Sequence, residues 1–245
     1  MNNTDFIYGL RPILEAIRSG KTIDRLLIKK GMKGALYAEL VEELKTHSIP
    51  YQLVPLEKLN RTTRKNHQGV IALLSAIEYH DIATLLPGIY ESGRDPMIIV
   101  LNNISDVRNF GAIARSAECF GADCIIIPEK GAARVNAEAV KTSAGALNKI
   151  PVARVKSITK TLEFLKESGL KIICASEKGK SRIGTDKLSG PAVLVMGSED
   201  RGVSPEILSM ADIELSIPLT GSIESLNVSV AAGILLYMIS KSRMQ

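Results

Sequence analysis

From about residue 97 onward, short apolar runs alternate with stretches of helical periodicity. Continuous apolar runs of this length are typical of strands buried on both faces, and their alternation with helices is typical of a parallel sheet. The predicted strands are 97–101, 124–127, 171–175, 192–196 and 213–217. The predicted helices are 110–120, 136–147, 159–168, 204–210 and 226–241. The pattern indicates an open α/β sheet, which binds ligands beyond the carboxyl ends of its strands.

The first third of the chain has a smaller alternation of its own. Pro12 opens a predicted helix that Gly20 ends, and a second helix is predicted over 34–47. Strands are predicted at 26–28, 51–54 and 70–74. Turn-forming pairs such as Pro87-Gly88 then interrupt the pattern. We therefore expect a small α/β domain over 1–77, a linker over 78–95 and a larger domain over 96–245.

Composition places the chain among globular proteins. Of its 245 residues, 45% are hydrophobic and 23% are charged. No run approaches 18 apolar residues, and the N-terminus lacks the pattern of a signal peptide, so we expect a cytoplasmic protein. The cysteines have no CxxC spacing and lie in or beside apolar stretches, which predicts reduced core residues: Cys119, Cys124 and Cys174.

The charge is distributed unevenly. The net charge is +5, and residues 1–80 carry twelve Lys/Arg against eight Asp/Glu. No acid occurs between Glu57 and Glu78, a stretch rich in amides and hydroxyls that also contains Lys58, Arg61, Arg64 and Lys65. Such a loop offers phosphate contacts to a nucleic acid, and it is equally compatible with an ordinary solvated loop.

Two common nucleotide-binding motifs are excluded. Residues 197–202 have Walker-like glycine spacing, but Val203 and Ser204 follow where lysine and serine or threonine are required. Residues 102–106, which follow the first predicted strand of the larger domain, contain no GxGxxG turn. All three histidines precede residue 81, so chemistry in the larger domain does not use imidazole.

Polar residues instead gather in three segments after predicted strands: 106–116, 196–202 and 217–229. The first contains Asn109 and Arg115. Without any function, Asn109 is expected to be the N-cap of the helix and Arg115 an exposed charge on its surface. The second places Glu199 in a loop between glycines. The third places Ser225 and Asn227 before an apolar helix, where free backbone N–H groups gather and Ser225 is a candidate cap.

Together these segments resemble the three motifs of the SpoU-type (TrmH/RlmB) RNA ribose 2′-O-methyltransferases, over 96–245. The first domain resembles the small L30e-like RNA-binding domain of the 23S ribosomal RNA branch, through residues 6–9 and 67–70. The transfer-RNA branch typically lacks that domain. The resemblance implies a trefoil-knot SPOUT fold, S-adenosylmethionine as cofactor, no metal, and a homodimer that pairs through the knot-side helices and can combine residues of both subunits.

The resemblance also assigns roles to residues. It places around the cofactor Met196, Gly197, Ile217 and Leu226. It assigns to catalysis Asn109, Arg115, Glu199, Ser225 and Asn227. A guanidinium is effectively always protonated, so we expect Arg115 to hold a phosphate and stabilise the developing alkoxide. Lys141, in the acid-free stretch 140–162, is expected to flank the RNA unless it is only part of a solvated helix face.

The resulting hypothesis is methyl transfer to a ribose 2′-hydroxyl of RNA, at a guanosine of 23S ribosomal RNA. Two alternatives remain open at this stage: a guanosine 2′-O-methyltransferase acting on transfer RNA, and an RNA-binding protein without catalytic activity.

Overall fold

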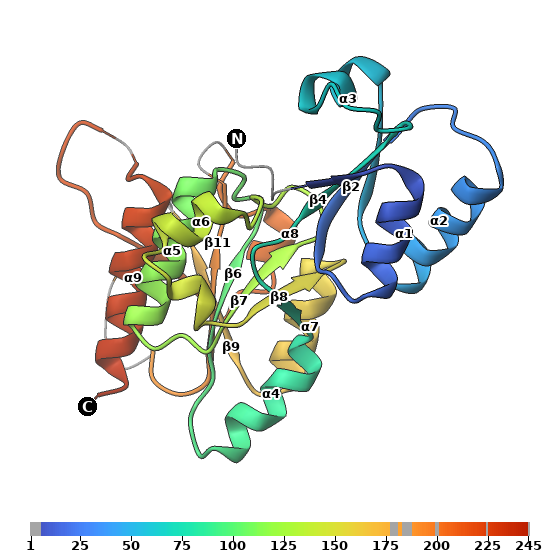
Figure 1. The fold of residues 1–245 in the computed structure, drawn as a ribbon. Coiled ribbons are helices and arrows are strands. Elements are labelled where there is room, and N and C mark those ends of the chain that lie inside the picture. The colour runs from blue at the N-terminus through green and yellow to red at the C-terminus, as the bar shows by residue number, and fades with distance from the viewer. Residues whose placement is uncertain (1–5, 177–180, 183–187, 199–200, 224, 245) are drawn as a thin grey trace. The chain divides into compact units, whose positions relative to one another are not determined.

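A computed structural model describes the chain except at residues 1–5, 177–180, 183–187, 199–200, 224 and 245. The chain divides into two compact units. The first comprises Met1–Glu78 and Arg134–Ala137, and the second comprises Tyr79–Ala133 and Glu138–Gln245. Both units combine helices with a sheet (Figure 1).

The first unit has a four-stranded sheet in the order β1-β4-β2-β3. Its strands are β1 (Phe6–Tyr8), β2 (Ile23–Lys29), β3 (Tyr51–Val54) and β4 (Val70–Leu74), and its helices are α1 (Leu10–Arg18), α2 (Ala35–Thr46) and α3 (Leu56–Thr62). Successive residues of a strand face opposite sides of a sheet. Accordingly Leu26 and Ile28 pack with α1 and α2, whereas Leu27 packs with Leu59 of α3 on the other face.

The second unit has an eight-stranded sheet in the order β10-β12-β9-β11-β6-β7-β8-β5, and its strands pair in parallel. The strands are β5 (Tyr79–His80), β6 (Met97–Leu101), β7 (Cys124–Pro128), β8 (Val152–Val155), β9 (Lys171–Ala175), β10 (Ser181–Arg182), β11 (Ala192–Met196) and β12 (Ile213–Ser216). Every residue of β6 and β11 is buried, as their apolar runs predict.

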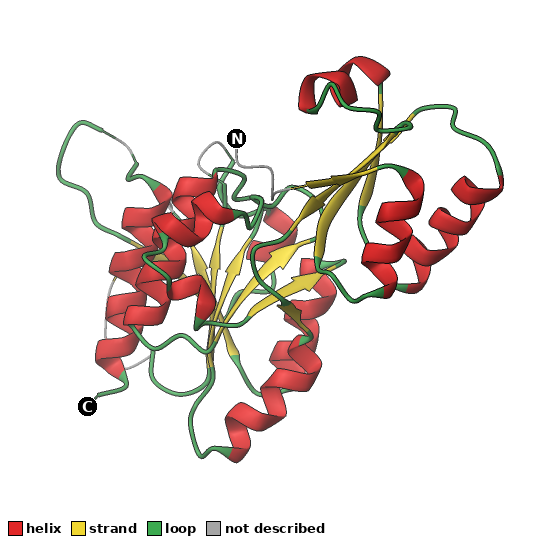
Figure 2. Ribbon diagram, in the orientation of Figure 1, coloured by secondary structure: helices red, strands yellow, loops and turns green. Residues whose placement is uncertain are grey.

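Helices cover both faces of this sheet (Figure 2). They are α4 (Ile82–Glu91), α5 (Val107–Cys119), α6 (Ala137–Thr142), α7 (Ile158–Glu167), α8 (Pro205–Leu208) and α9 (Val228–Ser242), with a short 3-10 turn at Ala146–Asn148. Apolar residues of α4, α7 and α8 share one core with β6 and β11. Helices α5, α6 and α9 lie on the opposite side (Figure 1). No helix within the described residues is both long and apolar enough to cross a membrane.

Of the linker expected over 78–95, Glu78 belongs to the first unit and residues 79–95 belong to the second. Strand β5 extends the large sheet by pairing with β8, and α4 buries Ile82, Leu86 and Ile89. Pro87 lies inside α4, where it removes one backbone hydrogen bond. The expectation was wrong because burial of the apolar face of α4 outweighs the proline, and because Asp81 caps the helix by accepting from the Ala83 N–H at 3.0 Å.

Three local predictions also differ from the structure. The basic stretch expected to be a loop begins as helix α3. The helix predicted over 136–147 stops early, because Ala144 and Gly145 have φ of 50° and 85° and so leave the helical conformation. Strand β8 was not predicted because Arg154 interrupts its apolar run. The Arg154 guanidinium is accommodated there by the ring of Tyr79, whose centre lies 3.6 Å away.

The cysteine prediction holds for two of the three residues. Cys124 and Cys174 are buried, and burial raises the pKa of each thiol to about 12. Cys119, at the end of α5, is exposed and is not a core residue. All three cysteines are free thiols.

Candidate active site

The first two polar segments begin at the same edge of the sheet. Strands β6 and β11 are parallel neighbours, so their carboxyl ends lie side by side. The Asn102 N–H, just after β6, donates a hydrogen bond of 2.9 Å to the carbonyl oxygen of Met196 at the end of β11. The segment that leads into α5, where Asn109 lies, and the loop that begins at Gly197 therefore leave the sheet from adjoining positions.

Gly197 leaves no room for a side chain. A Cβ atom on it would lie 2.0 Å from the carbonyl carbon of Gly202 and 2.3 Å from the nitrogen of Val203. The loop is closed by the Gly202 N–H, which donates to the Ser198 carbonyl at 2.8 Å. Met196 and Gly197 are buried, and because Gly197 has no side chain, only its backbone atoms are present at this position. Glu199 lies outside the described residues.

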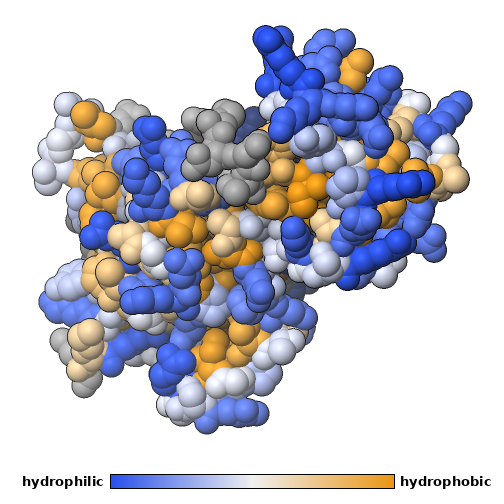
Figure 3. Space-filling model, viewed as in Figure 1, coloured by the Kyte–Doolittle hydropathy of each residue, from blue (hydrophilic) through white to orange (hydrophobic). Residues whose placement is uncertain are grey.

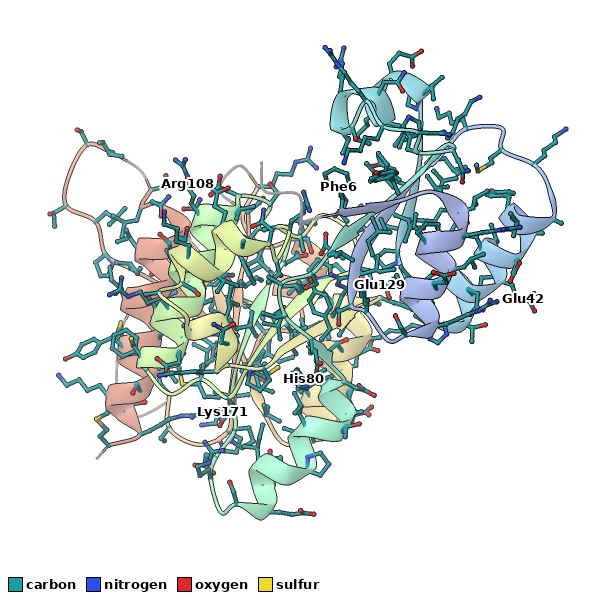
Figure 4. The ribbon with its side chains drawn as sticks, in the orientation of Figure 1. Phe6, Glu42, His80, Arg108, Glu129 and Lys171 are labelled. Atoms are coloured by element: carbon teal, nitrogen blue, oxygen red, sulfur yellow. The ribbon has the colours of Figure 1, made fainter. Side chains whose placement is uncertain are left out.

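The start of α5 is capped by Asp106, not by Asn109. Its carboxylate accepts hydrogen bonds from the backbone N–H groups of Arg108, at 2.9 Å, and Asn109, at 2.8 Å. Arg108, labelled in Figure 4, marks this end of the helix. The N-cap interpretation of Asn109 was therefore wrong. Asp106 could have been recognised in the sequence, since aspartate before an apolar helical pattern is a common cap.

The start of α9 is built in the same way. Asn227 is the N-cap, and its Oδ1 accepts from the Ser229 N–H at 2.9 Å and from the Ser229 Oγ at 2.6 Å. Ser225 is exposed and is not the cap. Because Oδ1 is the acceptor, Nδ2 of Asn227 is left to donate. It donates to Oδ1 of Asn109 at 3.1 Å.

The hydrogen bond between the two asparagine side chains joins the starts of α5 and α9, which are far apart in sequence. The structure thus brings together two of the residues that the resemblance assigned to catalysis. Ser229, the last residue of the third segment, was given no role of its own from the sequence, and its hydroxyl bonds to the same side chain of Asn227.

Arg115 lies farther along α5, in a different setting. It is exposed and, with Ser116, Ser229, Gly233 and Tyr237 among others, lines a hollow of about 590 Å³ between α5 and α9. It stands six positions after Asn109, which is about 9 Å along a helix and on another side of it. Within the described part of the chain, its guanidinium makes no hydrogen bond or ion pair.

The packing of α5 explains a further residue of the first motif. A Cβ on Gly111 would lie 2.8 Å from the Cβ of Thr142 and 2.9 Å from the carbonyl oxygen of Ala139. Only glycine allows α6 to approach α5 this closely. Lys141, the RNA-contact candidate on α6, is exposed in the last turn of that helix.

The third segment presents apolar side chains at the surface. Ile217, directly after β12, is half-buried, and Leu226 is 36% exposed. Leu219 and Ile223 are exposed as well. Exposed apolar groups in a loop beyond a strand end suit a flat, weakly polar ligand group such as a purine base.

The four basic candidates of the first unit are all exposed. Lys58 and Arg61 lie on α3, and Arg64 and Lys65 lie in the turn that follows it. The Lys65 ammonium is 5.9 Å from the centre of the Tyr8 ring. The surface over α3 is strongly hydrophilic (Figure 3).

The two short motifs that carry the resemblance of the first unit lie side by side. Strand β1 pairs with β4, and the Gly9 N–H donates to the Val70 carbonyl at 3.2 Å. The Gln68 Oε1 accepts from the Leu10 N–H at 3.3 Å.

Comparisons with known proteins match both units. Residues 96–237 match the SpoU rRNA methylase family, and residues 6–80 match a domain described as RNA 2′-O ribose methyltransferase substrate binding. The putative TrmH family tRNA/rRNA methyltransferase YacO of Bacillus subtilis (strain 168) is 31% identical over 239 residues, 98% of this chain and 96% of that protein. An uncharacterized tRNA/rRNA methyltransferase of Mycobacterium avium (strain 104) is 37% identical over 98% of this chain and 78% of its own length.

Solved structures share the fold. The SpoU methyltransferase AviRb from Streptomyces viridochromogenes, in complex with AdoMet, has a TM-score of 0.59 at 24% identity, over 98% of this chain and 90% of that one. The A. aeolicus TrmH/SpoU tRNA modifying enzyme has a TM-score of 0.55 at 31% identity, over 62% of this chain and 77% of its own. These similarities confirm the predicted fold class, a mainly parallel α/β sheet preceded by a small α/β domain.

Proposed function

The chain belongs to the SpoU family of RNA methyltransferases, which use S-adenosylmethionine, and from this premise we propose that it methylates a ribose 2′-hydroxyl of RNA. The hydrogen bond between Asn109 and Asn227 carries the proposal within the structure, because it assembles residues of the first and third motifs at one place. Bound S-adenosylmethionine supplies a methyl group on a sulfonium, which is already activated toward attack by an oxygen.

The residues present fit this cofactor. The closed loop at Gly197 leaves backbone groups as the means of contact at that position. Ile217 and Leu226 offer apolar surface for an adenine, and they lie in the segment that leads into α9. We assign cofactor binding to these three residues together with Met196, as the resemblance implies.

Arg115 is the residue proposed to act on the ribose. Its guanidinium remains protonated, so it serves as a hydrogen-bond donor and not as a base. It holds a phosphate of the substrate nucleotide and stabilises negative charge on the attacking 2′-oxygen, while the hydroxyl proton leaves to a phosphate oxygen or to water. Its exposed position leaves it free to meet such a substrate.

The other proposed residues position the reactants. The hydrogen bond between Asn109 and Asn227 holds the starts of α5 and α9 side by side. The exposed Ser225 contributes a hydroxyl to the substrate pocket. Glu199 is proposed to anchor Arg115 or a donor group of the substrate.

We further propose a homodimer formed through α5 and α9. Val230 and Tyr237 on α9 are each 50% exposed, and the Tyr237 ring lies 5.8 Å from that of Phe120. The side chains of Val230 and Tyr237 line the same hollow as Arg115. A second copy covering this face brings Arg115 of one subunit close to residues of the other.

For the substrate we propose a guanosine of 23S ribosomal RNA. The match of residues 6–80 to a substrate-binding domain supports this choice. The transfer-RNA enzyme of A. aeolicus aligns with only 62% of this chain. Transfer RNA is the second candidate, because the similar proteins of B. subtilis and M. avium are named for both RNA classes.

The test uses purified protein with methyl-labelled S-adenosylmethionine and, in parallel, 23S ribosomal RNA and total transfer RNA. We expect label on the ribosomal RNA, at a nucleotide whose 3′ linkage resists alkaline hydrolysis because its 2′-oxygen is methylated. Label on transfer RNA alone would select the second candidate. Label on a base, or on neither RNA, would contradict the proposal.

A further inference from the structure

A second hollow, of about 490 Å³, lies within the first unit and outside the proposed active site. It is formed where the end of β2, the loop before α2 and the turn before β4 meet. We call it the lysine hollow, and its lining consists of Lys29, Gly31, Met32, Lys33, Leu56, Lys65, Asn66, His67, Gln68 and Gly69.

The lysine hollow is strongly cationic. Lys29 and Lys33 come from the end of β2 and the loop that follows it, Lys65 comes from the turn after α3, and none of the lining residues is acidic. Two of the three acids of α2 are engaged elsewhere, because Glu39 and Glu43 pair with Arg18 at 2.7 and 2.8 Å. Three exposed lysines around one hollow, with no carboxylate among its lining residues, favour an anionic ligand, and phosphate groups of RNA are the anions that this class of enzyme encounters.

The floor of the lysine hollow is fixed by hydrogen bonds. His67 is buried; its Nδ1 accepts from the Gly69 N–H at 3.0 Å, so its Nε2 carries the proton donated to the Asn60 Oδ1 at 2.9 Å. Gly69 has φ of 81°, and a Cβ on it would lie 2.9 Å from the Met32 Cε. A binding surface held in this way loses little entropy when a ligand arrives.

The lining is also partly apolar. Met32 is half-buried and Leu56 is 38% exposed. Beside them stand the exposed amides of Asn66 and Gln68; the amide of Asn66 and the amide nitrogen of Gln68 can pair with the edge of a base, since Gln68 Oε1 accepts from the Leu10 N–H. A volume of about 490 Å³ falls within the range of small-ligand sites, about 300–1,000 Å³, and suits one nucleotide better than a helix. Bases inside an RNA duplex are stacked and inaccessible, whereas bases of loops and bulges are not.

We propose that the lysine hollow binds a single unstacked nucleotide of the RNA substrate, with its phosphate on Lys29, Lys33 and Lys65 and its base against Met32 and Leu56. This inference rests on the proposed function for the identity of the anion. It specifies that the first unit recognises non-helical RNA, and it adds Lys29 and Lys33 to the basic residues expected to contact RNA.

The phosphate contact is tested in the full chain with a labelled RNA hairpin that carries one bulged 2-aminopurine. Lys29→Ala/Lys33→Ala should weaken binding of this hairpin at least about tenfold and flatten its salt dependence. The matched control is Lys21→Ala/Lys45→Ala, which removes the same charge from exposed positions outside the hollow and should change affinity by less than about twofold. Equal losses in both double variants would overturn the proposal. If the double variant does not fold, Lys33→Ala alone is measured, because Lys33 lies outside the helices and strands of the described chain and its substitution should still weaken binding.

The base contact is tested with the same hairpin and a fully paired one of equal length. The wild-type protein should prefer the bulged hairpin about tenfold and change its 2-aminopurine fluorescence, and Leu56→Ser should reduce both effects. Equal affinity for the two hairpins, or binding without a fluorescence change, would overturn the proposal.

The same preparations are assayed for S-adenosylmethionine binding and for methyl transfer to RNA. If RNA is methylated but the lysine variants behave like the control, only this inference fails. If the bulged hairpin binds as expected but no RNA is methylated, the proposed function fails and the nucleotide site stands.

Discussion

Two asparagines show how far individual residues can be understood from sequence. Asn109 and Asn227 stand 118 positions apart, and the resemblance alone placed them in one site. The structure supplies the physical reason, because Asp106 caps α5 while the Asn109 side chain accepts from Asn227. Helix-capping rules could have identified Asp106, whereas nothing local in the sequence shows that α5 and α9 begin side by side.

Substitution of Arg115 tests the proposed chemistry. Arg115→Ala should lower the rate of methyl transfer about 100-fold or more, because it removes a donor aimed at developing negative charge. Binding of S-adenosylmethionine, measured by calorimetry, should change by less than about twofold.

The matched control for Arg115 is Lys160→Ala, which removes an exposed charge on α7 and should leave the rate unchanged. Full activity of Arg115→Ala would exclude Arg115 from the mechanism.

Among the secondary-structure elements, the buried strands were the easiest to predict. Strands β6, β9 and β11 have the bounds that their apolar runs indicate, because a strand buried on both faces requires continuous apolar residues. Short edge strands such as β5 and β10 carry no such signal. Their positions depend on neighbours distant in sequence, which a local pattern does not contain.

The contribution of the Asp106 cap to the stability of α5 can be tested by substitution. Asp106→Ala should lower the free energy of unfolding by about 1 kcal/mol, since two N–H groups lose their acceptor and the carboxylate no longer faces the positive end of the helix. Thermal unfolding measures this loss. Asp106→Asn keeps a capping oxygen and should recover most of it. Equal destabilisation by both substitutions would show that capping is not the role of Asp106.

Arg243, directly after α9, bonds to the segments that lead into β6 and β11. Its guanidinium donates to the carbonyls of Asp95, Pro96 and Gly190 at 3.2, 2.8 and 2.6 Å, and burial lowers its pKa from the ordinary value. Arg243→Ala should cost about 2–3 kcal/mol, because it leaves these carbonyls without their charged donor.

The control for Arg243 is Lys241→Ala, an exposed neighbour on α9, which should cost less than about 0.5 kcal/mol. Denaturant unfolding compares the two variants, and equal midpoints would contradict this role of Arg243.

For the molecule as a whole, the division into two units and the uneven charge were visible in the sequence. The end of the first unit was predicted at residue 77 and lies at Glu78, but the linker expected after it was wrong, because Pro87-Gly88 looks like a linker when α4 is considered without the core it covers. The trefoil knot stays a prediction from the family resemblance, since a knot depends on how the whole chain is threaded and not on any local pattern.

The proposed dimer is a whole-molecule prediction. Tyr237→Glu places a charge on the exposed apolar face of α9 and should convert a dimer into a monomer in light scattering, with loss of methyl transfer. Tyr90→Glu changes another exposed tyrosine, on α4, and should leave the mass of the wild-type dimer unchanged. A wild-type protein that is already monomeric would contradict the proposal.

The central claim is that this chain methylates one ribose of 23S ribosomal RNA. The most direct measurement maps 2′-O-methyl groups in total RNA from cells with and without the gene, and from cells that express Arg115→Ala instead. We predict that one 2′-O-methylguanosine of 23S ribosomal RNA is absent without the gene and absent with the variant. Ribose methylation that is identical in all three samples would contradict the account.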